Sequence, residues 1–358
     1  MSRPDARPGR GAPENRVPTR FGLATREADG DWLDVLDDVD GGAPPLRTTV
    51  TVEKPRTIIT KNASPDVGFD RSINPYRGCE HGCIYCFARP THAFHDLSPG
   101  LDFESKLFAK PDAAVLLRAE LGKRGYVPAP IAIGTNTDPY QPIEGKWRIM
   151  RSVVDVLAET NHPLCITTKS DRVTRDIDLL SGMAKKGLVS VAISITSLTP
   201  EISRTLEPRA PAARKRLAAV KMLSSAGVPT TVAIAPVVPG ITDCEMEDII
   251  AAAAEAGAVG VFYLPVRLPF EVAPLFRAWL DEHFNERAGK VMSIIQSLRG
   301  GRDNDPNWFT RMRGEGPWAD LLETRFKLAA KKHGFPKERA KLRTDLFVPP
   351  QGPQMRLL

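Results

Sequence analysis

A regular alternation between short apolar runs and helical patterns starts near residue 64, and it constrains the fold more strongly than any other feature of this sequence. The runs are rich in Val and Ile, are bounded by Gly, Pro or Asn, and cover residues 131–134, 164–168, 188–195, 231–238 and 259–266. Such runs predict strands that are buried on both faces of a sheet. Apolar residues at helical spacing lie between them, so we expect parallel strands joined by helices.

Together with a first strand expected at residues 72–76, this alternation predicts about six β/α units. We therefore expect an α/β protein whose parallel sheet curls into a partial (β/α)6 barrel over residues 51–285. Residues 1–50 begin with an Arg-, Pro- and Gly-rich stretch and are expected to be disordered or loosely docked. Residues 286–358 break the alternation and are expected to form a C-terminal helical extension.

The five cysteines do not form a pattern that suits a disulfide framework. Their number is odd, and three of them lie between residues 79 and 86. No apolar run approaches the roughly 20 residues that a membrane-spanning helix needs, so we expect a protein of the reducing cytoplasm without a membrane contact. The net charge of +6 suits an acidic partner, such as nucleic acid or an acidic electron-transfer protein, although a merely solvated basic surface carries the same charge.

Cys79, Cys83 and Cys86 place three thiolates in one compact loop directly after the first expected strand. Thiolates are soft ligands that suit iron–sulfur clusters or zinc. Three protein ligands leave one coordination position of the metal site open, which is typical of catalytic rather than structural metal sites. Gly78 and Gly82 allow the backbone to bend closely around a bulky group. In β/α folds this loop lies at the carboxyl end of the sheet, where active sites gather.

A zinc site is the alternative interpretation of the same loop. His81, His92 or His95 would then complete a Cys3His ligand set. The protein would in that case be a zinc-stabilised nucleic-acid-binding protein with a non-catalytic barrel. The colour of the purified protein separates the two hypotheses, because an iron–sulfur protein is brown and a zinc protein is colourless.

The spacing C-x3-C-x2-C, with Tyr85 before the last cysteine, resembles the signature of the radical S-adenosylmethionine (SAM) superfamily. The longer stretch from Asn74 to His92 resembles the branch related to spore photoproduct lyase, and the similarity extends over about residues 68–285. The resemblance implies a [4Fe-4S] cluster held by the three cysteines, with SAM at the open iron. One electron from a donor such as ferredoxin or flavodoxin would cleave SAM to a 5′-deoxyadenosyl radical, which abstracts hydrogen from the substrate.

The same resemblance implies roles for residues at successive strand ends. Residues 134–138, Gly-Thr-Asn-Thr-Asp, stand where the superfamily often has Gly-Gly-Glu, so Thr135 and Thr137 are expected to take the amino group of SAM. Lys169 resembles the lysine that meets the methionyl carboxylate of SAM. The other contacts that the resemblance implies are Ser194 and Thr196 to the ribose or carboxylate, and residues 235–240 against adenine. Tyr85, from its place in the loop, either shields the cluster or packs in the core.

Several further positions have two interpretations each. Glu207 and Arg209 either lie beside the expected cavity or belong to a rigid, solvated proline loop. Asp138 and Tyr140 are candidates for substrate or radical-relay groups. The C-terminal residues that interleave cations with aromatic rings either stack on bases or dock the extension on the barrel; they are Arg302, Trp308, Phe309, Arg311, Arg313 and Trp318.

The expected substrate is a nucleic acid or another macromolecule, on the basis of the positive charge and the lyase resemblance. The lyase itself donates a hydrogen atom from a cysteine in the segment after its second strand, whereas residues 135–137 are Thr-Asn-Thr. We therefore expect lyase-like radical chemistry but not the repair of thymine dimers.

Overall fold

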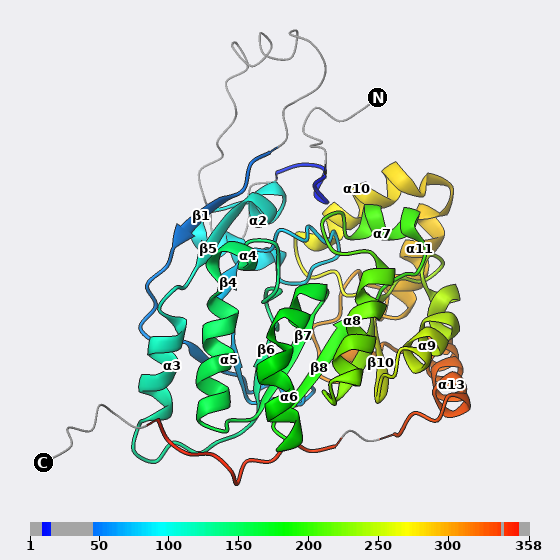
Figure 1. The fold of residues 1–358 in the computed structure, drawn as a ribbon. Coiled ribbons are helices and arrows are strands. Elements are labelled where there is room, and N and C mark those ends of the chain that lie inside the picture. Colours follow the sequence, from blue (N-terminus) through cyan, green and yellow to red (C-terminus); the bar gives the residue numbers. More distant parts are fainter. Residues whose placement is uncertain (1–8, 16–45, 338–339, 351–358) are drawn as a thin grey trace, which may run out of the picture.

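Six parallel strands form the main sheet of the molecule, in a computed structural model that describes residues 9–15, 46–337 and 340–350 (Figure 1). Their spatial order follows the chain, and the antiparallel strand β2 (Ile59–Lys61) pairs with β3 at one edge. The predicted α/β fold with a partial (β/α)6 barrel is confirmed. The six strands are β3 (Arg71–Ile73), β6 (Ile131–Ile133), β7 (Leu164–Thr168), β8 (Val189–Ser194), β9 (Thr230–Val237) and β10 (Gly260–Pro265).

The expected first strand is divided between two sheets. Residues 71–73 form β3, whereas Tyr76–Arg77 form β4 in a separate sheet with β1 (Thr49–Val52) and β5 (Lys106–Ala109), in the order β1-β5-β4. The prediction of one strand over residues 72–76 is therefore wrong. The division occurs at Asn74 and Pro75, because proline has no N–H for a strand ladder and the carbonyl of Pro75 instead accepts the N–H of Lys110 at 3.1 Å.

Helices cover the outer face of the main sheet, as Figure 1 shows for α3, α5, α6, α8 and α9. Their apolar sides pack on the strands in one hydrophobic core, in which Val153, Leu180 and Val220 are each 0% exposed. The helices are α2 (Leu101–Ser105), α3 (Ala113–Leu121), α4 (Glu144–Trp147), α5 (Ile149–Glu159), α6 (Ile177–Lys185), α7 (Pro200–Leu206), α8 (Ala213–Ser225), α9 (Met246–Glu255) and α10 (Val272–His283). Short 3-10 helices are η2 (Arg89–His95), η3 (Asp171–Asp176) and η4 (Asp243–Glu245).

The C-terminal residues form a helical extension with α11 (Asn285–Ser297), α12 (Thr310–Arg313) and α13 (Pro317–Lys332). The following segment runs along the lower edge of the barrel in Figure 1. There the ring of Phe347 lies 5.5 Å from that of Tyr126 and 5.4 Å from that of His162, centroid to centroid. Within the described residues, no helix combines the length and the apolar composition that crossing a membrane requires.

Two parts of the N-terminal segment predicted over residues 1–50 are described. Residues 9–15 lie against the barrel, where Ala12 is only 2% exposed, and residues 46–50 lead into β1. Residues 1–8 and 16–45 of this segment lie outside the described residues.

Candidate functional site

The three clustered cysteines lie in the loop between β4 and η2, and all three are free thiols. Cys79 and Cys83 are each 7% exposed. Gly78 has a φ of +71°, and a Cβ there would lie 2.6 Å from the Leu107 side chain. Only glycine adopts this conformation without strain at so close an approach, so the loop needs Gly78, as predicted.

Burial controls the chemistry of these thiols. It raises the pKa of Cys83 to about 12, with a further contribution from the nearby Glu207 carboxylate. The pKa of Cys79 is raised well above its ordinary value by burial and by Asp138. The thiols are therefore protonated in the metal-free protein, and binding of metal must release their protons.

The cysteine loop fits a multi-iron cluster better than a single ion. Among the residues that the structure describes, no three His, Cys, Asp or Glu side chains converge as ligands of one metal ion. The thiolates of a cluster bind different iron atoms, so they need not converge on one point. Three soft donors in one loop, of which Cys79 and Cys83 are buried and Cys86 is half-buried, are the donor set that an iron–sulfur cluster with one open iron requires.

The histidines considered for zinc have other contacts. His92 Nε2 lies 2.9 Å from the carbonyl oxygen of Lys106, and its ring packs edge-on against Phe103. His81 Nδ1 lies 3.4 Å from Asp138 Oδ2. The His95 ring lies 4.6 Å from that of Phe108, centroid to centroid. One ring nitrogen of each histidine, Nδ1 of His81 and His92 and Nε2 of His95, has no hydrogen-bond partner. Within the described residues, however, none of the three joins the cysteines in a group that could hold one metal ion, so the zinc alternative gains no support.

Thr135 and Thr137 lie in the loop after β6, and Asn74 organises this loop. The Asn74 amide oxygen accepts the N–H of Asn136 at 3.0 Å, and its amide nitrogen donates to Thr135 Oγ1 at 3.1 Å. The Thr137 hydroxyl has no hydrogen-bond partner although the residue is only 4% exposed. An orphaned buried hydroxyl is costly unless a ligand satisfies it. Thr137 is thus better suited than Thr135 to contact a bound molecule.

Lys169 follows β7 directly and joins the ends of two further strands. Its Nζ lies 2.7 Å from Ser194 Oγ, at the end of β8, and 3.5 Å from the carbonyl oxygen of Ala235 in β9. Ser194 Oγ also donates to this carbonyl at 2.9 Å, and Thr196 Oγ1 lies 3.2 Å from it. Lys169 after β7, Ser194 and Thr196 at the end of β8, and Ala235 of β9 were predicted separately as site residues, and the structure brings them into contact. The charged Nζ also lies 5.7 Å from the centre of the Tyr85 ring, close to the cysteine loop.

A buried carboxylate completes this group. Glu207 accepts hydrogen bonds from the hydroxyls of Tyr85 and Thr196 and lies 3.8 Å from Lys169 Nζ. It also pairs with Arg216 of α8, and the two side chains are only 1% and 2% exposed. Burial alone would raise the pKa of Glu207, but Arg216 and Lys169 hold it at about 2.

Sequence reasoning left Glu207 ambiguous and missed Arg216 and Asn74. An arginine among the apolar positions of residues 213–225 was the available signal for Arg216, because a buried guanidinium needs an acceptor. Arg209, which was considered together with Glu207, lies apart from it: its Nη2 donates to Glu80 Oε1 at 3.1 Å.

Asp138 connects the loop after β6 to the start of the Lys169 turn. Its carboxylate accepts from Thr168 Oγ1 at 2.6 Å and from the N–H of Lys169 at 2.7 Å. Burial alone would raise the pKa of Asp138, but His81 and these hydrogen bonds outweigh burial and lower this pKa to about 2. Tyr140 points elsewhere, since it is fully buried and its hydroxyl donates to Asp176 at 2.9 Å.

Part of the cationic and aromatic set of the C-terminal extension contacts the barrel. Arg311 pairs with Asp66 of the barrel, and Trp318 packs against the main hydrophobic core. Arg313 instead pairs with Glu323 of α13, within the extension. Trp308 and Phe309 stay exposed, at 57% and 63%. The docking interpretation therefore describes Arg311 and Trp318.

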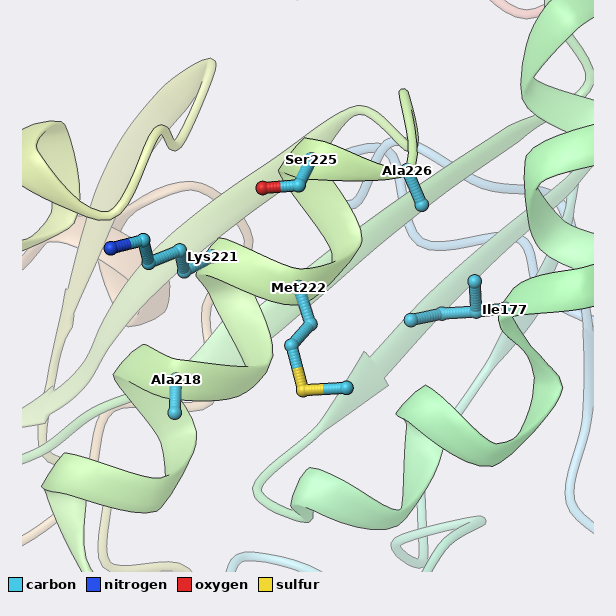
Figure 2. A pocket seen from close by; sticks show the side chains of 6 residues that line it. All are labelled: Ile177, Ala218, Lys221, Met222, Ser225 and Ala226. Carbon is cyan, nitrogen blue, oxygen red and sulfur yellow. The ribbon is translucent and has the colours of Figure 1, made fainter.

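A shallow hollow of about 590 Å³ lies on the outer helical layer, away from the cysteines. Figure 2 shows the Met222 side chain of α8 reaching toward Ile177 at the start of α6. Its lining is mostly apolar, with Lys221 and Ser225 as its polar members, and contains no carboxylate, histidine or thiol.

Comparison with known proteins agrees with this geometry. Residues 73–253 match the family model described as the radical SAM superfamily. An uncharacterized protein of Mycobacterium tuberculosis (strain ATCC 25618 / H37Rv) is 38% identical over 230 residues, which are 64% of this chain and 68% of that protein. An uncharacterized protein of Methanocaldococcus jannaschii is 30% identical over 176 residues, 48% of this chain and 62% of its own length.

Among solved structures, spore photoproduct lyase complexed with dinucleoside spore photoproduct is similar to this chain, with a TM-score of 0.55. The alignment covers 80% of this chain and 79% of the lyase chain at 16% identity, so the likeness concerns the fold alone.

Proposed function

Because this chain belongs to the radical SAM superfamily, we propose that it binds a [4Fe-4S] cluster through Cys79, Cys83 and Cys86 and cleaves SAM reductively. When bound, the cluster and SAM supply one-electron chemistry that yields a 5′-deoxyadenosyl radical and removes hydrogen from the substrate. The observation that carries the proposal is one loop with three free thiols, two of them buried, next to Lys169 at the carboxyl end of the parallel strand β7.

The residues around this loop have the donors and acceptors that SAM requires. An ammonium group has three donors, and the contacts of Lys169 Nζ with Ser194 and Ala235 account for two, so one is free for the methionyl carboxylate. The orphaned hydroxyl of Thr137 is the proposed acceptor for the amino group. Thr196 and Thr135 then act by holding neighbouring groups in place, through their hydrogen bonds with Glu207 and Asn74.

Tyr85 is proposed to shield the site from water. It is only 7% exposed, and its hydroxyl is held by Glu207 and by Thr196 Oγ1 at 3.3 Å. A dry, preorganised pocket strengthens electrostatic contacts with SAM and protects a radical from side reactions.

Anaerobic reconstitution with iron and sulfide tests the proposal. We expect a brown protein with about four irons per chain, an electron paramagnetic resonance signal after reduction, and formation of 5′-deoxyadenosine when SAM and dithionite are added. Cys83→Ala should lose the signal and the product. The matched control is Cys244→Ala, since Cys244 is exposed and lies outside the cysteine loop. A wild-type protein that binds iron but never forms 5′-deoxyadenosine would contradict the proposed reaction.

The proposed substrate is a nucleic acid, or another macromolecule that carries phosphates and rings. Phe87 directly follows Cys86 and is 51% exposed, and the guanidinium carbon of Arg267 lies 5.9 Å from the centre of its ring. The Nε of Arg267 has no hydrogen-bond partner, and its Nη1 donates to Met312 Sδ at 3.4 Å. A flat ring beside a guanidinium with an unused donor suits a base and its phosphate. Spore photoproduct lyase, which shares the fold, is known with a bound dinucleoside.

Binding of a fluorescent single-stranded oligonucleotide tests this substrate class. Arg267→Gln should weaken binding and lower the slope of log affinity against log salt by about 1. Arg277→Gln is the control, because Arg277 already pairs with Asp303 at 2.6 Å. Equal binding by both variants and the wild type would exclude a role for Arg267.

The proposed electron donor is a reduced ferredoxin or flavodoxin. The net charge of +6 suits docking of an acidic protein. Activity with such a donor should fall as salt is raised, whereas activity with dithionite should change little. The proposed location is the cytoplasm, whose reducing conditions keep the cysteines free for a cluster.

A further inference from the structure

The N-terminal segment Gly9–Asn15 lies directly against the cysteine loop, although it is outside the part of the chain that matches the superfamily. At Gly11 an added Cβ would lie only 1.7 Å from the carbonyl oxygen of Gly82, which stands between two of the cysteines. Ala12 packs in one apolar cluster with Cys83, Ile84 and Tyr85. The segment is thus in backbone contact with the loop.

Glu104 of α2 holds the segment and the loop at the same time. The residue is 0% exposed, and its two carboxylate oxygens accept the N–H groups of Gly11 and Ala12 at 2.9 and 2.8 Å. One of these oxygens also accepts from Arg89 Nη2 at 2.5 Å. A buried carboxylate is stable only with such compensation, so the segment and Arg89 each satisfy part of its charge.

Arg89 connects this carboxylate to the cysteine loop. It is 0% exposed, its Nε donates to the carbonyl of Cys83 at 2.9 Å, and its Nη2 donates to that of Gly82 at 3.1 Å. Its Nη1 donates to the carbonyls of Pro99 and Gly100, both at 3.0 Å. With Glu104, these contacts account for all five N–H donors of a guanidinium.

Two further anchors fix the ends of the segment. Arg10 donates from Nη1 to the carbonyl of Glu104 at 2.7 Å and from Nη2 to that of Leu46 at 2.5 Å. Asn15 and Asp102 exchange two hydrogen bonds, at 3.0 and 3.1 Å. An added Cβ at Gly100 would lie 2.0 Å from the carbonyl oxygen of Glu14. Glycines therefore stand on both sides of the contact where the backbones approach most closely.

We propose that Gly9–Asn15 is a wall of the cluster compartment and that Glu104 is a positioning residue, which holds this wall and, through Arg89, the cysteine loop. The inference rests on the proposed cluster at Cys79, Cys83 and Cys86. The wall covers the outside of the loop and limits the access of solvent, oxygen and chelators to the cluster. The cluster site of this protein is then completed by residues that lie far before the superfamily domain.

The test compares full-length Gly11→Ala with Gly68→Ala after anaerobic reconstitution. A Cβ at Gly11 collides with Gly82, whereas a Cβ at Gly68 has no atom within 4 Å. We expect Gly11→Ala to lose iron to a chelator, and to bleach in air, about tenfold faster than the wild type, because two hydrogen bonds to a buried carboxylate are weakened. Gly68→Ala should behave as the wild type. Arg10→Gln, which removes an anchor without a collision, should shift both rates in the same direction.

A second measurement separates positioning from simple stability. Glu104→Gln keeps the shape of the side chain but leaves the Arg89 guanidinium without a countercharge beside the loop. The midpoint potential of the cluster should therefore rise, and by more than in Gly11→Ala, which loosens the same contact but keeps the charge of Glu104.

The outcomes are distinguishable from failure of the proposed function. A wild type that takes up no iron would overturn the proposed function. A wild type that takes up iron normally, with Gly11→Ala and Arg10→Gln losing it at the wild-type rate and an unchanged potential in Glu104→Gln, would overturn only the inference about the wall.

Discussion

Replacing Arg216 by glutamine is expected to lower the free energy of unfolding by about 3 kcal/mol at neutral pH, because it leaves the buried carboxylate of Glu207 poorly compensated. The pKa of Glu207 is held at about 2, against an ordinary value of 4.5, although burial alone would raise it. One pKa unit corresponds to about 1.4 kcal/mol, so folding stabilises the ionised form by about 3 kcal/mol. The two side chains are 2% and 1% exposed, so solvent screens this interaction little.

The pH dependence of this effect has a definite sign. A carboxyl group with a depressed folded-state pKa contributes stability above its unfolded pKa and loses it as the pH falls from 4.5 towards 2. In Arg216→Gln, burial is less opposed and the pKa of Glu207 rises. The free energy of unfolding of the variant therefore falls less on acidification than that of the wild type. The difference in unfolding free energy between the two proteins narrows as the pH is lowered.

Urea unfolding of the metal-free protein, followed by circular dichroism at neutral pH and at a pH between 4.5 and 2, measures both effects. Arg277→Gln is the control, because its partner Asp303 and Arg277 itself are 27% and 42% exposed. Exposed pairs of this kind contribute about 0–1 kcal/mol. The reasoning is refuted if Arg216→Gln costs no more than Arg277→Gln, or if the gap to the wild type widens in acid.

Three further changes probe other parts of the molecule. Lys169→Ala should weaken SAM binding to the reconstituted protein about tenfold without reducing its iron content, since one charge-assisted contact is lost. Equilibrium dialysis measures the affinity for SAM. An unchanged affinity would remove Lys169 from the proposed SAM site. Gly78→Ala should lower the iron content of the reconstituted protein, because the φ of Gly78 is +71° and the new Cβ would lie 2.7 Å from the Phe103 carbonyl oxygen. The control Gly182→Ala should keep its iron, since a Cβ there has no atom within 4 Å. Equal iron contents of the two variants would contradict this reasoning. Burial lowers the pKa of His162 to about 4, so stability should fall as the pH drops from 6.5 towards 4. His162→Gln should flatten that part of the profile, and an unaltered profile assigns the loss to another group.

Features set by local patterns were predictable from the chain alone. Strands β6 to β10 were found because Val and Ile pack well on a sheet that is covered by helices, and this preference shows in runs of a few residues. The cysteine loop was found because its three ligands come from one short segment. The glycine at position 78 follows from the same local geometry.

Contacts between distant segments were decided by the tertiary structure. Arg89 was not singled out from the sequence, yet it binds Glu104, the residue that also holds Gly11 from 93 positions away in the chain. The Glu207–Arg216 pair likewise depends on how α8 packs on the sheet. The sequence spacing of such a pair does not predict its contact. The two side chains meet only after folding, and the local sequence around each residue does not specify its partner. A buried charge requires a partner, but only the folded backbone determines which residue supplies it.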